Sequence, residues 1–164
     1  MKRMRVASRW LLFPILLACA CAWSAETIRY VALVDGGKRA GQQVVSHRDD
    51  GVTTVEFTFK DNGRGPELKE QYTLAEDGTF KTYTVKGTST FGAPVEETFS
   101  IADGKAQWKS TSDRGEARVA AGAQYAPLGG TPQGISAALA ALSKRIGDGL
   151  PLIPSGTLRM RKVP

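Results

Sequence analysis

A turn cluster in the first half of the chain constrains the fold more than any other feature. Two runs of alternating apolar and polar residues, 52–60 and 67–74, flank the segment Asp61–Pro66. Within that segment Asn62 and Gly63 tolerate the positive φ of a tight reversal, and the closing proline cannot donate a backbone hydrogen bond to a strand. The two runs are therefore predicted to form the strands of a long antiparallel hairpin.

Similar runs and turn residues repeat along most of the chain. About eight runs of roughly six to nine residues are separated by short turns, which is typical of an antiparallel meander. The connections are too short for the crossovers that parallel strands need. We therefore predict a mainly β fold, an antiparallel meander of about eight strands forming a curved sheet or a half barrel. The predicted strands are residues 27–34, 40–47, 52–60, 67–74, 80–88, 95–101, 106–110 and 116–120.

The alternation within each run predicts which side chains share a face. In the fourth run, Tyr72 and Leu74 share a face on which Glu70 is the polar exception. In the fifth run, Phe80 falls opposite Tyr83. The fifth strand is therefore predicted to carry aromatic rings on both faces and to be covered on both.

One amphipathic helix is predicted after the strands. Thr131 and Pro132 are typical of an N-cap followed by proline at the first helical position, and Lys144 and Arg145 before a glycine favour a helix C-terminus. The helix is expected to pack on the sheet, and a short final strand, 157–162, follows it. The apolar residues at helical spacing are Ile135, Leu139, Leu142 and Ile146, with Ala138 and Ala141 nearby.

The first 25 residues are typical of a secretory signal peptide. Four basic residues precede an uncharged apolar run, 10–23, and small residues follow it. The run is short for a membrane span and contains Pro14, so an uncleaved anchor is the less favoured alternative. We therefore predict an exported protein, periplasmic or extracellular, with a single β-rich domain at 26–164.

Charge and cysteine content both depend on this leader. It holds four of the 22 basic residues and none of the 16 acidic ones, so 18 basic residues against 16 leave a net charge of +2, and no nucleic-acid partner is expected. Both cysteines, Cys19 and Cys21, lie within it. Cleavage after Ser24 or Ala25 would leave no cysteine. Alternatively, 16–19 resembles a lipoprotein box, in which Cys19 is lipidated and the protein contacts the membrane.

Few residues offer catalytic chemistry. His47 is the only histidine, which excludes a multi-histidine metal centre, and no cofactor is expected in this chain. A Ser46–His47–Asp49 or Asp50 grouping lacks a nucleophile-elbow motif, so hydrolysis through His47 is the least favoured function. Three pairs of carboxylates are adjacent in the sequence, and they lie at turns or alternate across a strand. This placement argues against paired acid–base chemistry. These pairs are Asp49-Asp50, Glu76-Asp77 and Glu96-Glu97.

Aromatic residues offer one candidate binding site. Phe57, Phe59, Tyr72 and Trp108 are most simply interpreted as core. On an open face of a curved sheet, the same four would line an apolar groove for a lipid or another hydrophobic ligand. An open groove at these residues would favour ligand binding, and a groove filled by the helix would count against it.

Three stretches resemble a known family. Residues 61–70, 87–97 and 108–116 resemble the N-terminal region of certain secreted bacterial proteins of the metal-dependent amidohydrolase superfamily. The resemblance extends over most of the chain after the leader, including the helix and 150–156. In that family a β-rich region precedes a TIM barrel that carries a histidine-rich metal site. The resemblance implies no catalytic residue here, because this chain contains no such barrel.

Two hypotheses follow. The leading one is a non-catalytic N-terminal accessory domain of an exported amidohydrolase-like protein, with the catalytic barrel as its partner and any divalent metal bound in that barrel. A strand-like run that stops at Pro164 without a turn or cap favours a truncated form of a longer protein. The alternative is a free-standing periplasmic binding or carrier module for a hydrophobic ligand.

Overall fold

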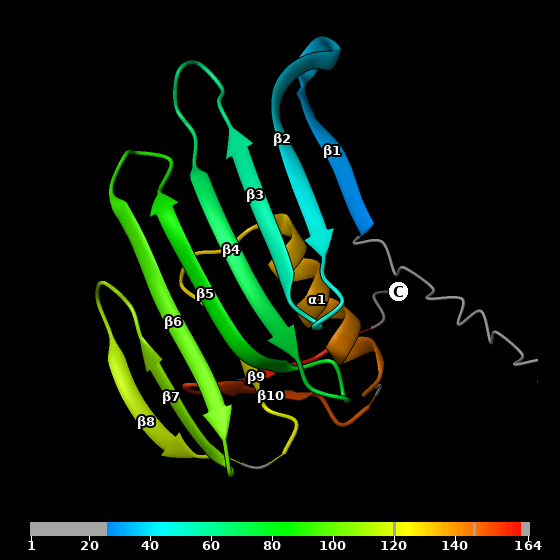
Figure 1. Cartoon of the computed structure of the whole chain (residues 1–164), viewed down its shortest axis with the longest axis vertical. Helices are drawn as coiled ribbons and strands as arrows, with labels where there is room; N and C mark the ends of the chain where they lie inside the picture. Colours follow the sequence, from blue (N-terminus) through cyan, green and yellow to red (C-terminus); the bar gives the residue numbers. More distant parts are fainter. Residues whose placement is uncertain (1–25, 120, 146, 162–164) are drawn as a thin grey trace, which may run out of the picture.

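A computed structural model describes residues 26–119, 121–145 and 147–161. The predicted signal peptide and Cys19 lie outside these residues. Eight strands form one antiparallel sheet in which every strand pairs with its neighbours in the sequence (Figure 1). The sheet is not closed, because β1 pairs only with β2 and β8 only with β7. The strands are β1 (Glu26–Val34), β2 (Lys38–His47), β3 (Thr53–Phe59), β4 (Glu67–Leu74), β5 (Phe80–Thr88), β6 (Pro94–Ala102), β7 (Lys105–Lys109) and β8 (Arg114–Arg118). The short 3-10 helix η1 (Asp35–Gly37) joins β1 to β2.

The turn between β3 and β4 confirms the predicted reversal. Asn62 and Gly63 have φ values of 49° and 75°. Their neighbours Asp61 and Arg64 exchange two backbone hydrogen bonds of 2.7 and 2.9 Å. Positive φ at both central residues gives the turn the twist that suits the two strands it connects.

A bulge in β5 corrects the predicted direction of the Phe80 side chain. The β4–β5 register shifts between Thr73 and Leu74, because Lys81 has no partner on β4. The extra residue turns Phe80 to the same face as Tyr83, where both are buried, and the aromatic rings of β5 do not lie on both faces. Leu74, the partner of Phe80 at the end of β4, is 43% exposed.

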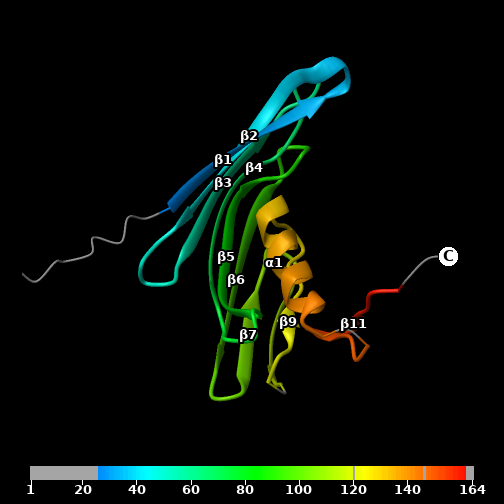
Figure 2. The ribbon, with the colours of Figure 1, turned by 90° about the vertical axis from the view of Figure 1, so that its right-hand side faces the viewer.

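A second layer covers part of one face of the sheet, here called the inner face (Figure 2). It contains α1 (Pro132–Ser143) and a small sheet of β9 (Gln124–Tyr125), β10 (Leu150–Ile153) and β11 (Thr157–Leu158). The sequence predicted the helix and β11, although β11 is shorter than expected. It did not predict β9 or β10, which pair in parallel across the intervening helix and are too short to carry an alternating pattern.

The helix packs through its small residues. Thr131 caps it as predicted, since its Oγ1 accepts a 3.3 Å hydrogen bond from the Gly134 amide. The large apolar side chains of the helix were predicted to pack on the sheet. This prediction is only partly right, because Ile135 and Leu139 are 62% and 50% exposed. A Cβ atom at Gly134 would lie 2.8 Å from Glu70 Oε1, so the helix approaches the sheet closely. Ile146 lies outside the described residues. The buried residues of α1 are Gly134, Ala137, Ala141 and Leu142.

An aromatic cluster forms the centre of the core. Phe80 lies between Tyr72 and Tyr83, with ring centroids 5.1 and 5.0 Å apart, respectively. Tyr125 of β9 stacks on Phe99 of β6 with centroids 4.5 Å apart. The cluster joins the large sheet to the second layer.

Candidate functional site: an apolar groove beside a tethered segment

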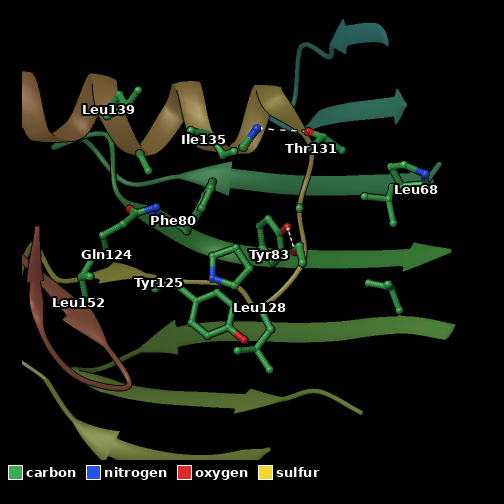
Figure 3. Close-up of a pocket in the computed structure, with 18 of the residues that line it drawn as sticks. Leu68, Phe80, Tyr83, Gln124, Tyr125, Leu128, Thr131, Ile135, Leu139 and Leu152 are labelled. Atoms are coloured by element: carbon green, nitrogen blue, oxygen red, sulfur yellow. Dashed lines mark hydrogen bonds between the residues drawn. The ribbon is translucent and has the colours of Figure 1, made fainter. Parts of the chain in front are cut away.

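The segment 126–131, here called the strap, connects β9 to α1 and crosses the inner face of the sheet (Figure 3). It carries two glycines, Gly129 and Gly130, and an exposed Leu128. Side chains from β4, β5 and β6 fix its position, as the following bonds show.

Glu97 of β6 holds the middle of the strap. Its carboxylate accepts hydrogen bonds from the amides of Leu128 (3.0 Å) and Gly129 (2.6 Å). It also accepts one from the Tyr125 hydroxyl at 3.1 Å. The Glu97 residue is only 3% exposed, so these donors take the place of water.

Glu70 of β4 holds the end of the strap. Its carboxylate accepts bonds from the Thr131 amide (2.8 Å), the Thr131 hydroxyl (3.1 Å) and the Tyr83 hydroxyl (2.9 Å). The Tyr83 hydroxyl is also 3.1 Å from the carbonyl of Gly129. Burial raises the pKa of the Glu70 carboxyl, although all three hydrogen bonds act in the opposite direction.

The two carboxylates lie in one row of the sheet. Glu70 and Glu97 are both direct partners of Val85, from opposite sides. Burial is the main cause that raises the pKa values of Tyr83 and Tyr125, and the neighbouring carboxylates raise them further. Both phenols therefore stay protonated and act as hydrogen-bond donors. The sequence indicated Glu70 only as an exception on an apolar face, and its pairing with Glu97 depends on strand register that alternation alone does not give.

A groove of about 700 Å³ opens between the strap, α1 and the inner face. In Figure 3 the rings of Phe80, Tyr83 and Tyr125 lie beneath it, and Ile135 and Leu139 project from the helix along its side. Leu152 and Leu158 of the small sheet also line it. Leu128, 71% exposed, lies beside it on the strap. The lining is therefore mainly apolar and partly solvent-exposed.

The four aromatic residues of the predicted groove lie elsewhere. Phe57 and Phe59 are half-buried on β3, and Tyr72 is 2% exposed. Trp108 is half-buried on β7, where its Nε1 donates a 3.0 Å hydrogen bond to Asp113. None of the four lines the 700 Å³ groove. The residues that line the groove come from the large sheet, the strap, α1 and the small sheet. Alternation predicted an apolar face for single strands and for the helix, but it did not indicate that these separate segments share one groove.

The groups considered for catalysis do not assemble around His47. Its Nδ1 lies 3.0 Å from the Thr53 hydroxyl, while Ser46 bonds to Thr27 and Asp50 pairs with Arg48. Across residues 26–119, 121–145 and 147–161, no cluster of three or more His, Cys, Asp or Glu side chains could hold a metal ion.

Comparisons with known proteins add no relative. No family model, curated protein or solved structure matches the chain significantly. In the described part of the chain, no helix has the length and apolar character required to cross a membrane. The groove and the sequence resemblance are therefore the two features that bear on function.

Proposed function

We propose that this chain is a non-catalytic accessory domain of an exported amidohydrolase-like protein, with the groove as its binding surface. The resemblance of residues 61–70, 87–97 and 108–116 supports the family. The buried carboxylates support binding over catalysis, because hydrogen bonds from the strap and from two tyrosines already occupy Glu70 and Glu97.

The exposure of large apolar side chains around the groove carries the proposal. Leu128, Ile135 and Leu139 come from two different segments and line the same groove. Exposed apolar groups gathered around a hollow are characteristic of sites that bind an apolar group. In the intact protein the groove would hold the apolar part of a substrate, and the barrel would supply the metal and the catalytic residues.

The first test is the coding sequence downstream of the Pro164 codon, read in all forward frames. We expect a histidine-rich barrel in frame or just out of frame. A stop codon after Pro164 with no barrel-coding sequence beyond it would contradict the accessory-domain proposal.

A second test uses the protein that contains the barrel. Leu139→Asp is expected to raise KM for an apolar substrate while kcat and metal content stay unchanged, because only the binding surface is altered. Ala140→Asp is the matched control, since Ala140 is exposed on the same helix and does not line the groove. Equal effects of the two substitutions would argue against a role for the groove.

The volume of the groove favours a second candidate, a free-standing periplasmic binding or carrier module for a hydrophobic ligand. About 700 Å³ lies within the range of roughly 300–1,000 Å³ that is typical of ligand pockets. The burial of Tyr72 counts against the groove predicted from sequence, whereas the groove beside the helix is open to a ligand. A gene without a barrel, together with ligand binding by the secreted protein, would select this candidate.

A further inference from the structure

The apolar groove adjoins a second, polar hollow at the hairpin turns. This hollow, of about 520 Å³, lies between the β3–β4 turn and the β5–β6 turn. Ser89 and Thr90 line both hollows. A ligand can therefore extend from an apolar region into a polar one. Lys60, Arg64, Ser89, Thr90 and Phe91 are among the residues that line the polar hollow.

The dimensions of the groove suit one extended chain. Phe80, the first residue of β5, and Ser89, which directly follows β5, both line it and lie nine residues apart, a distance of roughly 30 Å at the usual rise of a strand. An extended acyl chain fits such a passage better than a compact ring system does.

Among the described residues that line the polar hollow, Arg64 is the one cationic side chain that forms no ion pair. Lys60 is paired with Glu67 at 2.9 Å, whereas Arg64 makes no ion pair in the described part of the chain. Asp61 contacts Arg64 through the backbone and does not line the hollow. A guanidinium binds carboxylate and phosphate through paired hydrogen bonds, and the hydroxyls of Ser89 and Thr90 lie at the same hollow.

The carboxylates of Glu70 and Glu97, which hold the strap, disfavour binding of an anion in the middle of the groove. Glu70 and Glu97 place two carboxylates in one row of the sheet behind the strap, and no ion pair to either carboxylate is found within the described residues. A negative head group there would be repelled by both. The favourable place for a negative charge is therefore the hairpin end, at Arg64.

From this arrangement we infer that the site binds a single-chain anionic amphiphile, with its tail in the groove and its head at Arg64. The inference rests on the proposed role of the groove as a binding surface. The head is a carboxylate or a phosphate, as in a fatty acid or a lysophospholipid. Phe91, 83% exposed, adds an apolar side chain to the lining of the polar hollow.

The test is displacement of the fluorescent probe 11-(dansylamino)undecanoic acid from the purified exported protein, with competitors below their micelle concentrations. Hexadecanoic acid and hexadecanoyl lysophosphatidic acid supply the two anionic heads, and 1-hexadecanol supplies the same tail without charge. We expect at least one anionic competitor to bind about tenfold more tightly than the alcohol, a usual difference for a charge-assisted bidentate contact. The tighter of the two identifies the head group.

Two arginine variants locate the head. Arg64→Ala is expected to abolish the advantage of the anionic competitors and to leave 1-hexadecanol binding unchanged. Arg29→Ala is the matched control, because Arg29 is exposed on the opposite face of the sheet, and it should change neither. Equal binding of acid and alcohol by the unmodified protein, or equal losses for both in Arg64→Ala, would overturn the inference.

A groove variant separates failure of the inference from failure of the proposed function. Leu139→Asp should weaken the acid and the alcohol alike, because both tails contact the helix. If Leu139→Asp weakens both but the head group makes no difference, the groove binds apolar groups and only the anionic assignment fails. If no competitor binds, both the inference and the binding role of the groove fail, while the downstream coding sequence still tests membership of an amidohydrolase-like protein.

Discussion

Replacement of Glu97 by alanine provides the sharpest test of how the strap is held. The carboxylate accepts three hydrogen bonds, from the Tyr125 hydroxyl and from the amides of Leu128 and Gly129. Alanine removes every acceptor and leaves the tyrosine hydroxyl buried among aromatic rings. The two amides, which are only partly buried, can turn to water once the strap loosens.

The expected loss in the free energy of unfolding follows from those three donors. An unsatisfied buried donor costs about 1–3 kcal/mol, and each of the two strap amides loses a net contribution of about 0.5–1.5 kcal/mol. Removal of a buried charge offsets part of that loss. We expect Glu97→Ala to lower the free energy of unfolding by about 3 kcal/mol. Glu97→Gln should lose less, because its amide oxygen keeps one acceptor.

Urea unfolding followed by tryptophan fluorescence measures the change, since Trp108 packs against the core. At a slope of about 2 kcal/mol per molar urea, the midpoint should fall by about 1.5 M. Glu96→Ala is the matched control, because Glu96 is the neighbouring residue on the exposed face and forms an ion pair with Lys86. If the two alanine variants unfold at the same urea concentration, the strap is not anchored by Glu97 and the reasoning is refuted.

Two further predictions concern Glu70, the carboxylate that holds the end of the strap. Gly134→Ala should lower stability by about 1–2 kcal/mol in thermal unfolding despite a gain of about 1 kcal/mol in helix propensity, because its Cβ would lie 2.8 Å from Glu70 Oε1. Ser136→Ala, on the exposed side of α1, is the control, and a stabilised Gly134→Ala would contradict the close packing. Glu70 has a folded-state pKa above its ordinary value near 4.5, so the folded state binds this proton more tightly than the unfolded state does. Ionisation of Glu70 therefore costs stability at pH 7, and the cost is relieved as the pH falls through the folded-state pKa towards 4.5. The stability of Glu70→Gln, measured by urea unfolding from pH 7 to 4.5, should lack this component, and identical pH profiles would count against it.

The sequence was sufficient for the meander because its determinants are local. Asn62 and Gly63 specify the turn they occupy, and alternation within a run gives a strand with one apolar face. The cap at Thr131 is likewise encoded by the neighbouring residues. Each of these features can be read within about ten residues of chain.

Alternation failed where one residue changed the register. The bulge at Lys81 turned Phe80 inward, and nothing in the composition of that run indicates an unpaired residue. The helix shows the same limit, because Ile135 and Leu139 have the apolar character of a core face. Gly134 and its small neighbours lie against the sheet instead, since only they allow the close approach to Glu70.

The sequence by itself determined the eight strands of the large sheet, their antiparallel connection by short turns and the existence of the helix. Tertiary structure alone brought Glu70 and Glu97 into one row, placed the strap across them and left Leu128, Ile135 and Leu139 around a shared groove. The physical reason is the range of the interactions. Turns and alternation are set by neighbouring residues, whereas the tethers join groups 31 to 61 residues apart, whose meeting depends on register and close packing.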